Sequence, residues 1–214
     1  MDLELDAAEA RVLGSLLEKE IATPEYYPLS LNALVNACNQ KSNRDPVVAY
    51  DDDTVEEALD RLREKGLVLR VTGRDSRVPK HEQRFTEKFN LGRREAAIIC
   101  VLLLRGPQTV GELRGRTERL YTFDDLEAVE STLNRLGEME FTRQLPRQPG
   151  YKEQRYAHLL SGEVEAAAMP EAAPAPAAER GTSGSQGDRE RIAALEEGLA
   201  ALRREFEEFR RNFQ

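Results

Sequence analysis

Basic side chains gather in three short segments of this chain, where they could bind phosphate groups. Residues Arg70–Arg84 hold five bases and two acids, and residues Arg143–Arg155 hold four bases and one acid, so each segment has a net charge of +3. The string Lys41–Arg44 adds two bases and an amide. Because phosphate contacts dominate the affinity of proteins for nucleic acids, these segments are candidate nucleic-acid contacts. The candidate residues are Lys41, Asn43, Arg44, Arg74, Arg77, Lys80, Arg84, Arg147, Lys152 and Arg155.

Two other segments are strongly acidic, and the chain as a whole carries a net charge of −8. Residues Asp51–Glu64 hold seven acids and two bases, and residues Asp124–Glu138 hold five acids and one base. If these segments are helices presented to a major groove, their carboxylates repel the phosphates. We therefore expect a protein-interaction or architectural scaffold, with a DNA-binding regulator acting through the basic segments as the alternative. For both kinds of cluster, the simpler interpretation is that they are solvated surface charges.

The sequence offers little to support an enzyme. No Ser-His-Asp or Cys-His arrangement has a motif behind it, and Gly111 and Gly115 stand in a helical neighbourhood rather than in a phosphate-binding loop. Two histidines and two cysteines are too few for a zinc cluster at the usual spacings. We expect a non-enzymatic protein without a cofactor or a metal.

The string Asn39–Pro46 is denser in polar residues than a simple connection requires. Two interpretations stay open: it carries unrecognised chemistry, or its own side chains bind backbone groups and fix the loop. Tyr26, Tyr27 and Tyr50 flank the same region. They either form a binding surface or pin the insertions to the core through a wet hydroxyl group.

The remaining composition points to the cytoplasm. Met1–Glu4 is acidic and lacks the features of a secretory signal, and the longest apolar run, Ala96–Leu104, is too short to span a membrane. Cys38 and Cys100 sit among apolar neighbours, one in each half of the chain, so we expect two buried, reduced thiols.

The elements that position these segments occur twice. Val55–Leu62 matches Val129–Leu136 in its hydrophobic pattern, and helices are expected before both strings. The three helices of the first copy are expected at Ala8–Glu20, from Ser30 and from Asp53, and those of the second at Arg93–Leu104, from Thr109 and from Asp125. Gly66 favours a left-handed stop after the first copy. Glu140 takes its place in the second copy, so that end is expected to close differently.

A β-hairpin is expected after each third helix, from strands 67–71 and 81–85 in the first copy and 140–145 and 151–156 in the second. Three helices closed by a hairpin are typical of the winged helix-turn-helix, and we call the hairpins wings. The predicted fold class is mainly α with small β-hairpins (α+β), as two tandem winged-helix domains at 1–90 and 91–162, each with its own core.

The C-terminal part differs in composition. Residues 163–188 are rich in Ala, Pro, Gly and Ser and predict a disordered linker. Residues 189–214 predict a coiled-coil helix whose heptad seam is Ile192, Leu195, Leu199, Leu202, Phe206, Phe209 and Phe213. Such a short helix needs a partner, which is a second copy of the chain, a surface of the same chain or a foreign helix.

Six strings of the sequence are distinctive: Leu16–Lys19, Ala37–Val47, Arg77–Phe85, Leu103–Thr109, Gly111–Arg114 and Pro149–Tyr156. Together they resemble one family, the uncharacterised bacterial YceH-type proteins. The resemblance runs from about residue 5 to residue 162 and implies tandem winged helices followed by a variable linker and a coiled-coil-like end. It implies no established activity.

Overall fold

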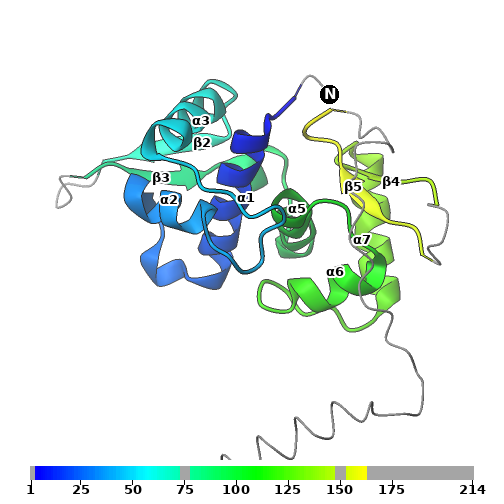
Figure 1. Ribbon diagram of the computed structural model, residues 1–214. Coiled ribbons are helices and arrows are strands. Elements are labelled where there is room, and N and C mark those ends of the chain that lie inside the picture. Colours follow the sequence, from blue (N-terminus) through cyan, green and yellow to red (C-terminus); the bar gives the residue numbers. More distant parts are fainter. Residues whose placement is uncertain (1–2, 73–77, 148–152, 163–214) are drawn as a thin grey trace, which may run out of the picture. The chain divides into compact units, whose positions relative to one another are not determined.

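The computed structural model describes residues 3–72, 78–147 and 153–162, which belong to one compact unit. The described residues form seven α-helices, one short 3-10 helix and five strands arranged in two small antiparallel sheets, an α+β architecture (Figure 1). The predicted linker at 163–188 and the predicted coiled-coil seam from Ile192 to Phe213 lie outside the described residues.

The first copy contains helices α1 (Ala7–Ala22), α2 (Leu31–Cys38) and α3 (Asp52–Glu64), with a 3-10 turn at Pro24–Tyr26. Ser30 caps α2 as predicted. The predicted cap of α3, Asp53, is wrong by two residues. The carboxylate of Asp51 accepts the Thr54 backbone N–H at 2.9 Å, so the helix begins one residue after Asp51.

The second copy contains α5 (Arg93–Arg105), α6 (Val110–Thr117) and α7 (Leu126–Glu138). Thr109 and Asp125 cap the last two helices, as predicted. Thr109 and Glu112 form a reciprocal capping box, in which each side chain accepts the other residue's backbone N–H.

The ends of α3 and α7 close in the same way, contrary to the expectation for Glu140. Gly66 has a φ of 65°, and Glu140 has a φ of 59°. After α3, the Leu67 N–H donates to the Leu62 carbonyl at 2.8 Å, and after α7 the Phe141 N–H donates to the Leu136 carbonyl at 2.9 Å. The backbone geometry therefore overrides the preference of a glutamate to avoid the left-handed region.

Each copy contains one small sheet, in which a pair of strands follows the third helix. In the first copy, β1 (Leu29–Ser30), β2 (Val68–Val71) and β3 (Lys80–Gln83) lie in the order β1-β3-β2. In the second copy, β4 (Thr142–Gln144) pairs with β5 (Tyr156–His158). The sequence did not predict β1.

Two strand predictions are wrong at their ends. Residue 85 does not extend β3 but begins a helical turn, α4 (Phe85–Lys88), because the side chain of Gln83 accepts the Thr86 N–H at 3.0 Å and the Phe85 ring is fully buried. The second strand of the second copy begins at Tyr156, where it was expected to end, because His158 pairs with Thr142.

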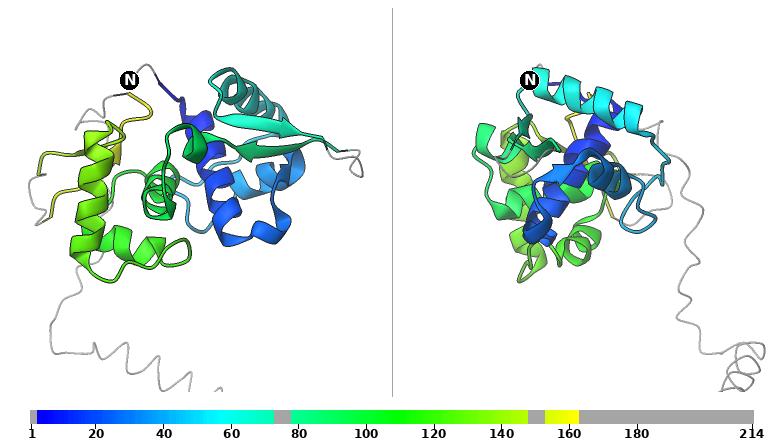
Figure 2. Two further views of the ribbon diagram at one scale, coloured as in Figure 1. Left: turned by 180° about the vertical axis from the view of Figure 1, so that it is seen from behind. Right: turned by 90° about the vertical axis from the view of Figure 1, so that its left-hand side faces the viewer.

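Helices α1 and α5 lie side by side between the two copies (Figures 1 and 2). Gly14 of α1 is fully buried there, and a Cβ atom at this position would come within 2.9–3.0 Å of Leu103 and Leu104. The Cys100 thiol of α5 donates to the Gly14 carbonyl at 3.5 Å. This close approach requires a residue without a side chain at position 14.

The expectation of two separate cores is wrong, since the buried apolar residues form one continuous cluster. Leu59 and Leu62 of α3 and Leu133 and Leu136 of α7 all belong to it. The rings of Phe85 and Phe141 join the copies edge to face, with centroids 5.5 Å apart. Both copies therefore pack on one shared hydrophobic core.

Candidate functional site

The exposed faces of α3 and α7 are acidic. Val55, Ala58, Leu59 and Leu62 hold α3 on the core, and Val129, Thr132, Leu133 and Leu136 hold α7. The acidic residues of both helices point to solvent. In α3 these exposed carboxylates are Asp52, Asp53, Glu56, Glu57, Asp60 and Glu64, and in α7 they are Glu127, Glu130 and Glu138.

Few of these carboxylates are neutralised. Glu57 pairs with Arg61 at 3.6 Å and Asp60 with Arg63 at 3.0 Å, both on the surface of α3. The other exposed carboxylates of the two helices form no ion pair with a cation in the described part of the chain. Both helices therefore present unbalanced negative charge.

Some cations at these helices also bind buried carboxylates. Arg135 of α7 has a side chain that is 56% exposed, and it binds the buried carboxylate of Glu95 on α5 at 2.9 Å. At the corresponding place in the first copy, Glu9 of α1 is buried and binds Lys65 at 2.5 Å, with Arg61 at 3.9 Å. Because part of this positive charge neutralises interior carboxylates, it offsets less of the charge on the acidic outer faces.

The predicted wing contacts are only partly open to a ligand. Arg84 binds Glu87 at 2.8 Å and Glu82 at 3.6 Å, and Arg155 binds Glu112 at 2.8 Å. Lys80 lies half-buried on β3, and Arg147 is exposed. Arg74, Arg77 and Lys152 lie outside the described residues.

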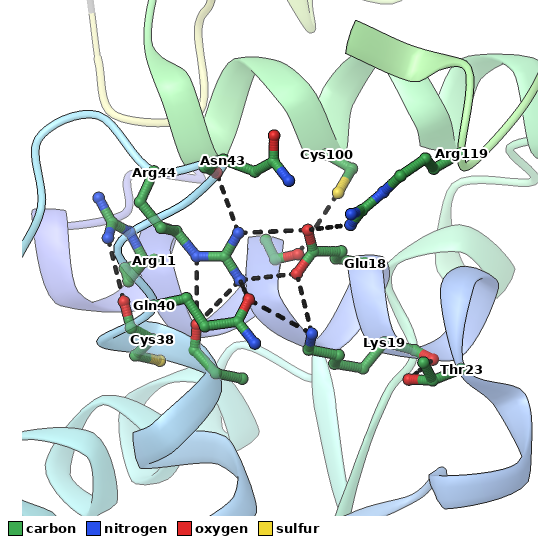
Figure 3. A network of polar contacts seen from close by, with 12 residues as sticks. Arg11, Glu18, Lys19, Thr23, Cys38, Gln40, Asn43, Arg44, Cys100 and Arg119 are labelled. Atoms are coloured by element: carbon green, nitrogen blue, oxygen red, sulfur yellow. Dashed lines mark hydrogen bonds and ion pairs between the residues drawn. The ribbon is translucent and has the colours of Figure 1, made fainter. Parts of the chain in front are cut away.

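Arg44 must be removed from the predicted nucleic-acid contacts. Its side chain is fully buried, and its guanidinium donates to both carboxylate oxygens of Glu18, at 3.2 and 2.6 Å (Figure 3). It also donates to the Ala37 carbonyl at 3.1 and 2.8 Å. Burial alone would raise the pKa of Glu18, but the bonds from Arg44 hold that pKa below its ordinary value. Arg44 is an internal counter-ion.

The loop around Arg44 is fixed by internal hydrogen bonds. The Asn39 amide accepts the Tyr50 N–H at 2.8 Å and donates to the Tyr50 carbonyl at 2.7 Å. Arg11 donates to the carbonyls of Cys38 and Pro46, at 3.1 and 2.6 Å. Of the two interpretations of the Asn39–Pro46 string, these contacts support a loop held by side-chain bonds to backbone groups.

Two loop residues face outward or toward the second copy. Lys41 is exposed. Asn43 has a φ of 57° and accepts a hydrogen bond from Arg105 of α5 at 3.0 Å. The backbone N–H of Asp45 donates to the Leu104 carbonyl at 2.9 Å. The loop therefore ties the first copy to α5 as well as carrying polar groups to the surface.

The three flanking tyrosines have different roles. The Tyr27 hydroxyl accepts the Gln83 backbone N–H at 2.5 Å, and Tyr50 packs on the core. Both pin their insertions, while Tyr26 is 71% exposed.

Sequence reasoning missed three basic residues of the second copy that face this loop: Arg105, Arg116 and Arg119 line a recess with Glu18 and Asn43. A signal existed in the run Arg114–Arg119, where three arginines stand within six residues. Their proximity to the loop depends on how the two copies pack, which no local pattern gives.

Other chemical groups offer no further site in the described residues. Cys38 and Cys100 are free and buried, as predicted, and burial raises the pKa of both thiols. Within residues 3–72, 78–147 and 153–162, no three His, Cys, Asp or Glu side chains are grouped to hold a metal ion. None of the helices in these ranges has the length and apolarity to span a membrane.

Comparison with known proteins places the chain in a bacterial family. A protein called UPF0502 from Solibacter usitatus is 70% identical over 214 residues, covering 100% of both chains. UPF0502 proteins from Citrifermentans bemidjiense and Aeromonas hydrophila are 52% and 50% identical, covering 94% and 95% of this chain and 90% and 93% of their own. The family described as "Protein of unknown function, DUF480" matches residues 5–151. The resemblance to an uncharacterised bacterial family is therefore confirmed, and the chain belongs to the DUF480 family.

Proposed function

We propose that this chain is a non-enzymatic scaffold of two tandem winged helices that binds a protein partner through the acidic faces of α3 and α7. The winged-helix assignment is supported by the order of elements, since three helices precede an antiparallel strand pair in each copy. In a DNA-reading winged helix the third helix enters the major groove. Here that helix is α3 or α7, and its exposed charge is of the wrong sign for phosphates.

The observation that carries the proposal is the unneutralised acid on α3. Asp52, Asp53 and Glu56 are exposed and form no ion pair with a described residue, while the apolar side of the helix is fully buried. A rigid helix with one buried face and one charged face suits a basic segment of a partner, because complementary charge speeds encounter and rejects wrong partners. The corresponding face of α7 gives the scaffold a second acidic surface on the same core.

The C-terminal heptad seam supplies a second point of attachment in this proposal. The seam residues 192–213 lie outside the described residues, so the proposal rests on their spacing alone. Self-association through this helix would give each assembly several acidic faces and raise its avidity for a partner.

A second candidate function is nucleic-acid binding through the wings. It is favoured by Arg70 and Lys80, which lie on β2 and β3 and form no ion pair with a described residue. Arg84 and Arg155 contribute less to such a surface, because each is already paired with a glutamate of the same chain. A wing lies along phosphates or enters a narrow minor groove, so the acidic helices need not touch the duplex.

A pull-down with the full chain, with and without nuclease, tests the proposal. We expect nuclease-resistant recovery of one protein, and its loss in the variant Asp52→Asn, Asp53→Asn, Glu56→Gln. The matched control is Glu25→Gln, Glu118→Gln, Glu153→Gln, which removes three exposed charges elsewhere. If recovery depends on nucleic acid, the wing candidate replaces the scaffold. Equal loss in both triple variants would show that only net charge matters, and the α3 surface would be rejected.

A further inference from the structure

A recess lies where the two copies meet, between α1 and the loop after α2 on one side and α5 and α6 on the other. Its lining includes Glu18, Asn43, Arg105, Arg116, Arg119 and Leu120. We call it the junction recess. It holds about 20 Å³, roughly the room for a single water molecule. A whole small-molecule ligand needs several hundred Å³, so anything bound here lies across the rim.

The charge of the junction recess is positive. Glu18 is the only carboxylate in its described lining, and that carboxylate is already neutralised from inside by Arg44. Lys19 stands at 3.5 Å from the same group. The three arginines of the second copy are therefore not balanced by the lining, in a chain whose net charge is −8.

The three arginines keep donors available. Arg105 uses Nη1 to bind Asn43, while its Nη2 forms no hydrogen bond or ion pair with a described residue. Arg116 reaches Glu112 only at 3.4 Å, since Glu112 binds Arg155 more closely at 2.8 Å. Arg119 has a side chain that is 65% exposed and lies 3.7 Å from Glu18.

The environment of Arg105 reflects the same excess of positive charge. Burial and the neighbouring guanidinium of Arg116 lower its pKa, while Asp45 and Glu112 act in the opposite sense. An arginine remains charged under these conditions, so Arg105 keeps a cationic guanidinium in the neighbourhood of Arg116. Guanidinium groups match phosphate oxygens in a bidentate geometry.

We propose that the junction recess binds the phosphate backbone of a nucleic acid, with Arg105, Arg116 and Arg119 as the contacts. A polymer is favoured over a single small anion because the recess has room for about one water molecule, so a ligand must lie across its rim, where a nucleic-acid backbone presents successive phosphates to the three arginines. The acidic faces of α3 and α7 repel the same polymer, so it approaches a surface that carries excess positive charge, as this junction does. The site is separate from the wings and does not depend on the protein-binding role.

Fluorescence anisotropy of the full chain with a labelled duplex of about 20 base pairs tests the site, from about 50 to 200 mM salt. The variant is Arg116→Gln, Arg119→Gln, and the control is Arg63→Gln, Arg93→Gln, which makes the same change in net charge at exposed residues outside the recess lining. We expect the wild type to bind at low salt. The junction variant should bind at least about tenfold more weakly, with a salt slope lower by about 1.8 for two lost phosphate contacts. The control variant should bind within about twofold of the wild type, because its residues do not line the recess.

Thermal melting of both variants checks that the fold is kept, which is expected because the ion pairs of Arg116 and Arg119 with described residues are long, at 3.4 and 3.7 Å. Three results overturn the proposal. The wild type fails to bind the duplex at low salt, or the control variant loses as much affinity as the junction variant. In the third, inorganic pyrophosphate binds in calorimetry with the same sensitivity to Arg116 and Arg119 while the duplex does not, which makes this a small-anion site.

Discussion

At the scale of single residues, the contact between Glu18 and Arg44 organises the centre of the molecule. Both side chains are almost fully removed from solvent. The guanidinium of Arg44 also donates to the backbone carbonyl of Ala37, near the C-terminus of α2. A buried ion pair adds little net stability compared with an apolar pair, but removing one partner leaves an uncompensated charge. Its role is therefore to fix the loop against α1.

Arg44→Ala should destabilise the protein by about 3–5 kcal/mol, because it strands the Glu18 carboxylate in the interior. The control Arg119→Ala removes an exposed arginine from the same carboxylate and should change stability by less than about 1 kcal/mol. Urea unfolding at neutral pH measures both. Equal urea midpoints for Arg44→Ala and Arg119→Ala would contradict a buried ion pair between Glu18 and Arg44.

A pH dependence follows from His158 of β5. Burial lowers its pKa from 6.5 to about 4, and its Nδ1 atom is shielded and has no hydrogen-bond partner among the described residues. The folded state therefore resists protonation, so this stability is complete above pH 6.5 and is lost as the pH falls toward 4. His81 acts in the same direction, because burial lowers its pKa as well.

The melting temperature of His158→Gln should therefore fall less steeply than that of the wild type between about pH 6.5 and 4. The matching change in the free energy of unfolding is on the order of 2 kcal/mol, after allowing for the partial exposure of His158. Calorimetry of both proteins across this range provides the measurement. Parallel curves for the variant and the wild type would mean that His158 titrates alike in the folded and unfolded chain.

At the scale of elements, the helices were predictable because their signals are local. Ser30, Thr109 and Asp125 cap helices where the sequence placed them, and the apolar spacing of α3 and α7 gave their buried faces. The strand ends were less predictable. The turn at Phe85 depends on a bond from the Gln83 side chain, and β5 takes its register from Thr142, which is a pairing across the hairpin.

The left-handed ends of α3 and α7 provide a prediction at this scale. Gly66→Ala should destabilise by about 1–2 kcal/mol, since its φ of 65° places a Cβ atom against the following carbonyl. The control Gly111→Ala lies in α6 with no atom within 4 Å of the new Cβ, and should stabilise by up to about 1 kcal/mol. Chemical denaturation compares the two. If Gly66→Ala leaves the free energy of unfolding unchanged, the left-handed backbone at residue 66 is contradicted.

At the scale of the whole molecule, the repeat was visible in the sequence but its packing was not. Each copy alone shows a buried face on its helices, and two separate cores are the simplest inference from that pattern. The shared core depends on Gly14 meeting Leu103 and Leu104, and on contacts between residues far apart in sequence. The same packing brings Arg105, Arg116 and Arg119 to the loop after α2, which is why the junction recess escaped sequence reasoning while the wings did not.

A shared core predicts cooperative unfolding of the two copies. The wild type should melt in one calorimetric transition, and Gly14→Val should lower its midpoint with a cost of about 1–3 kcal/mol or more, because the new side chain overlaps α5. Probes placed in each copy should shift together. Two separate transitions, with only the first copy affected by the substitution, would restore the expectation of independent cores.

The exposed acidic faces of α3 and α7 are the surfaces that we propose bind a protein. Site-specific photo-crosslinking from positions 56 and 130 in cells tests this, with position 25 as an exposed control. We expect positions 56 and 130 each to give an adduct with the same protein, unaffected by nuclease, and position 25 to give none. Adducts that disappear with nuclease, or adducts from position 25 alone, would contradict the proposal.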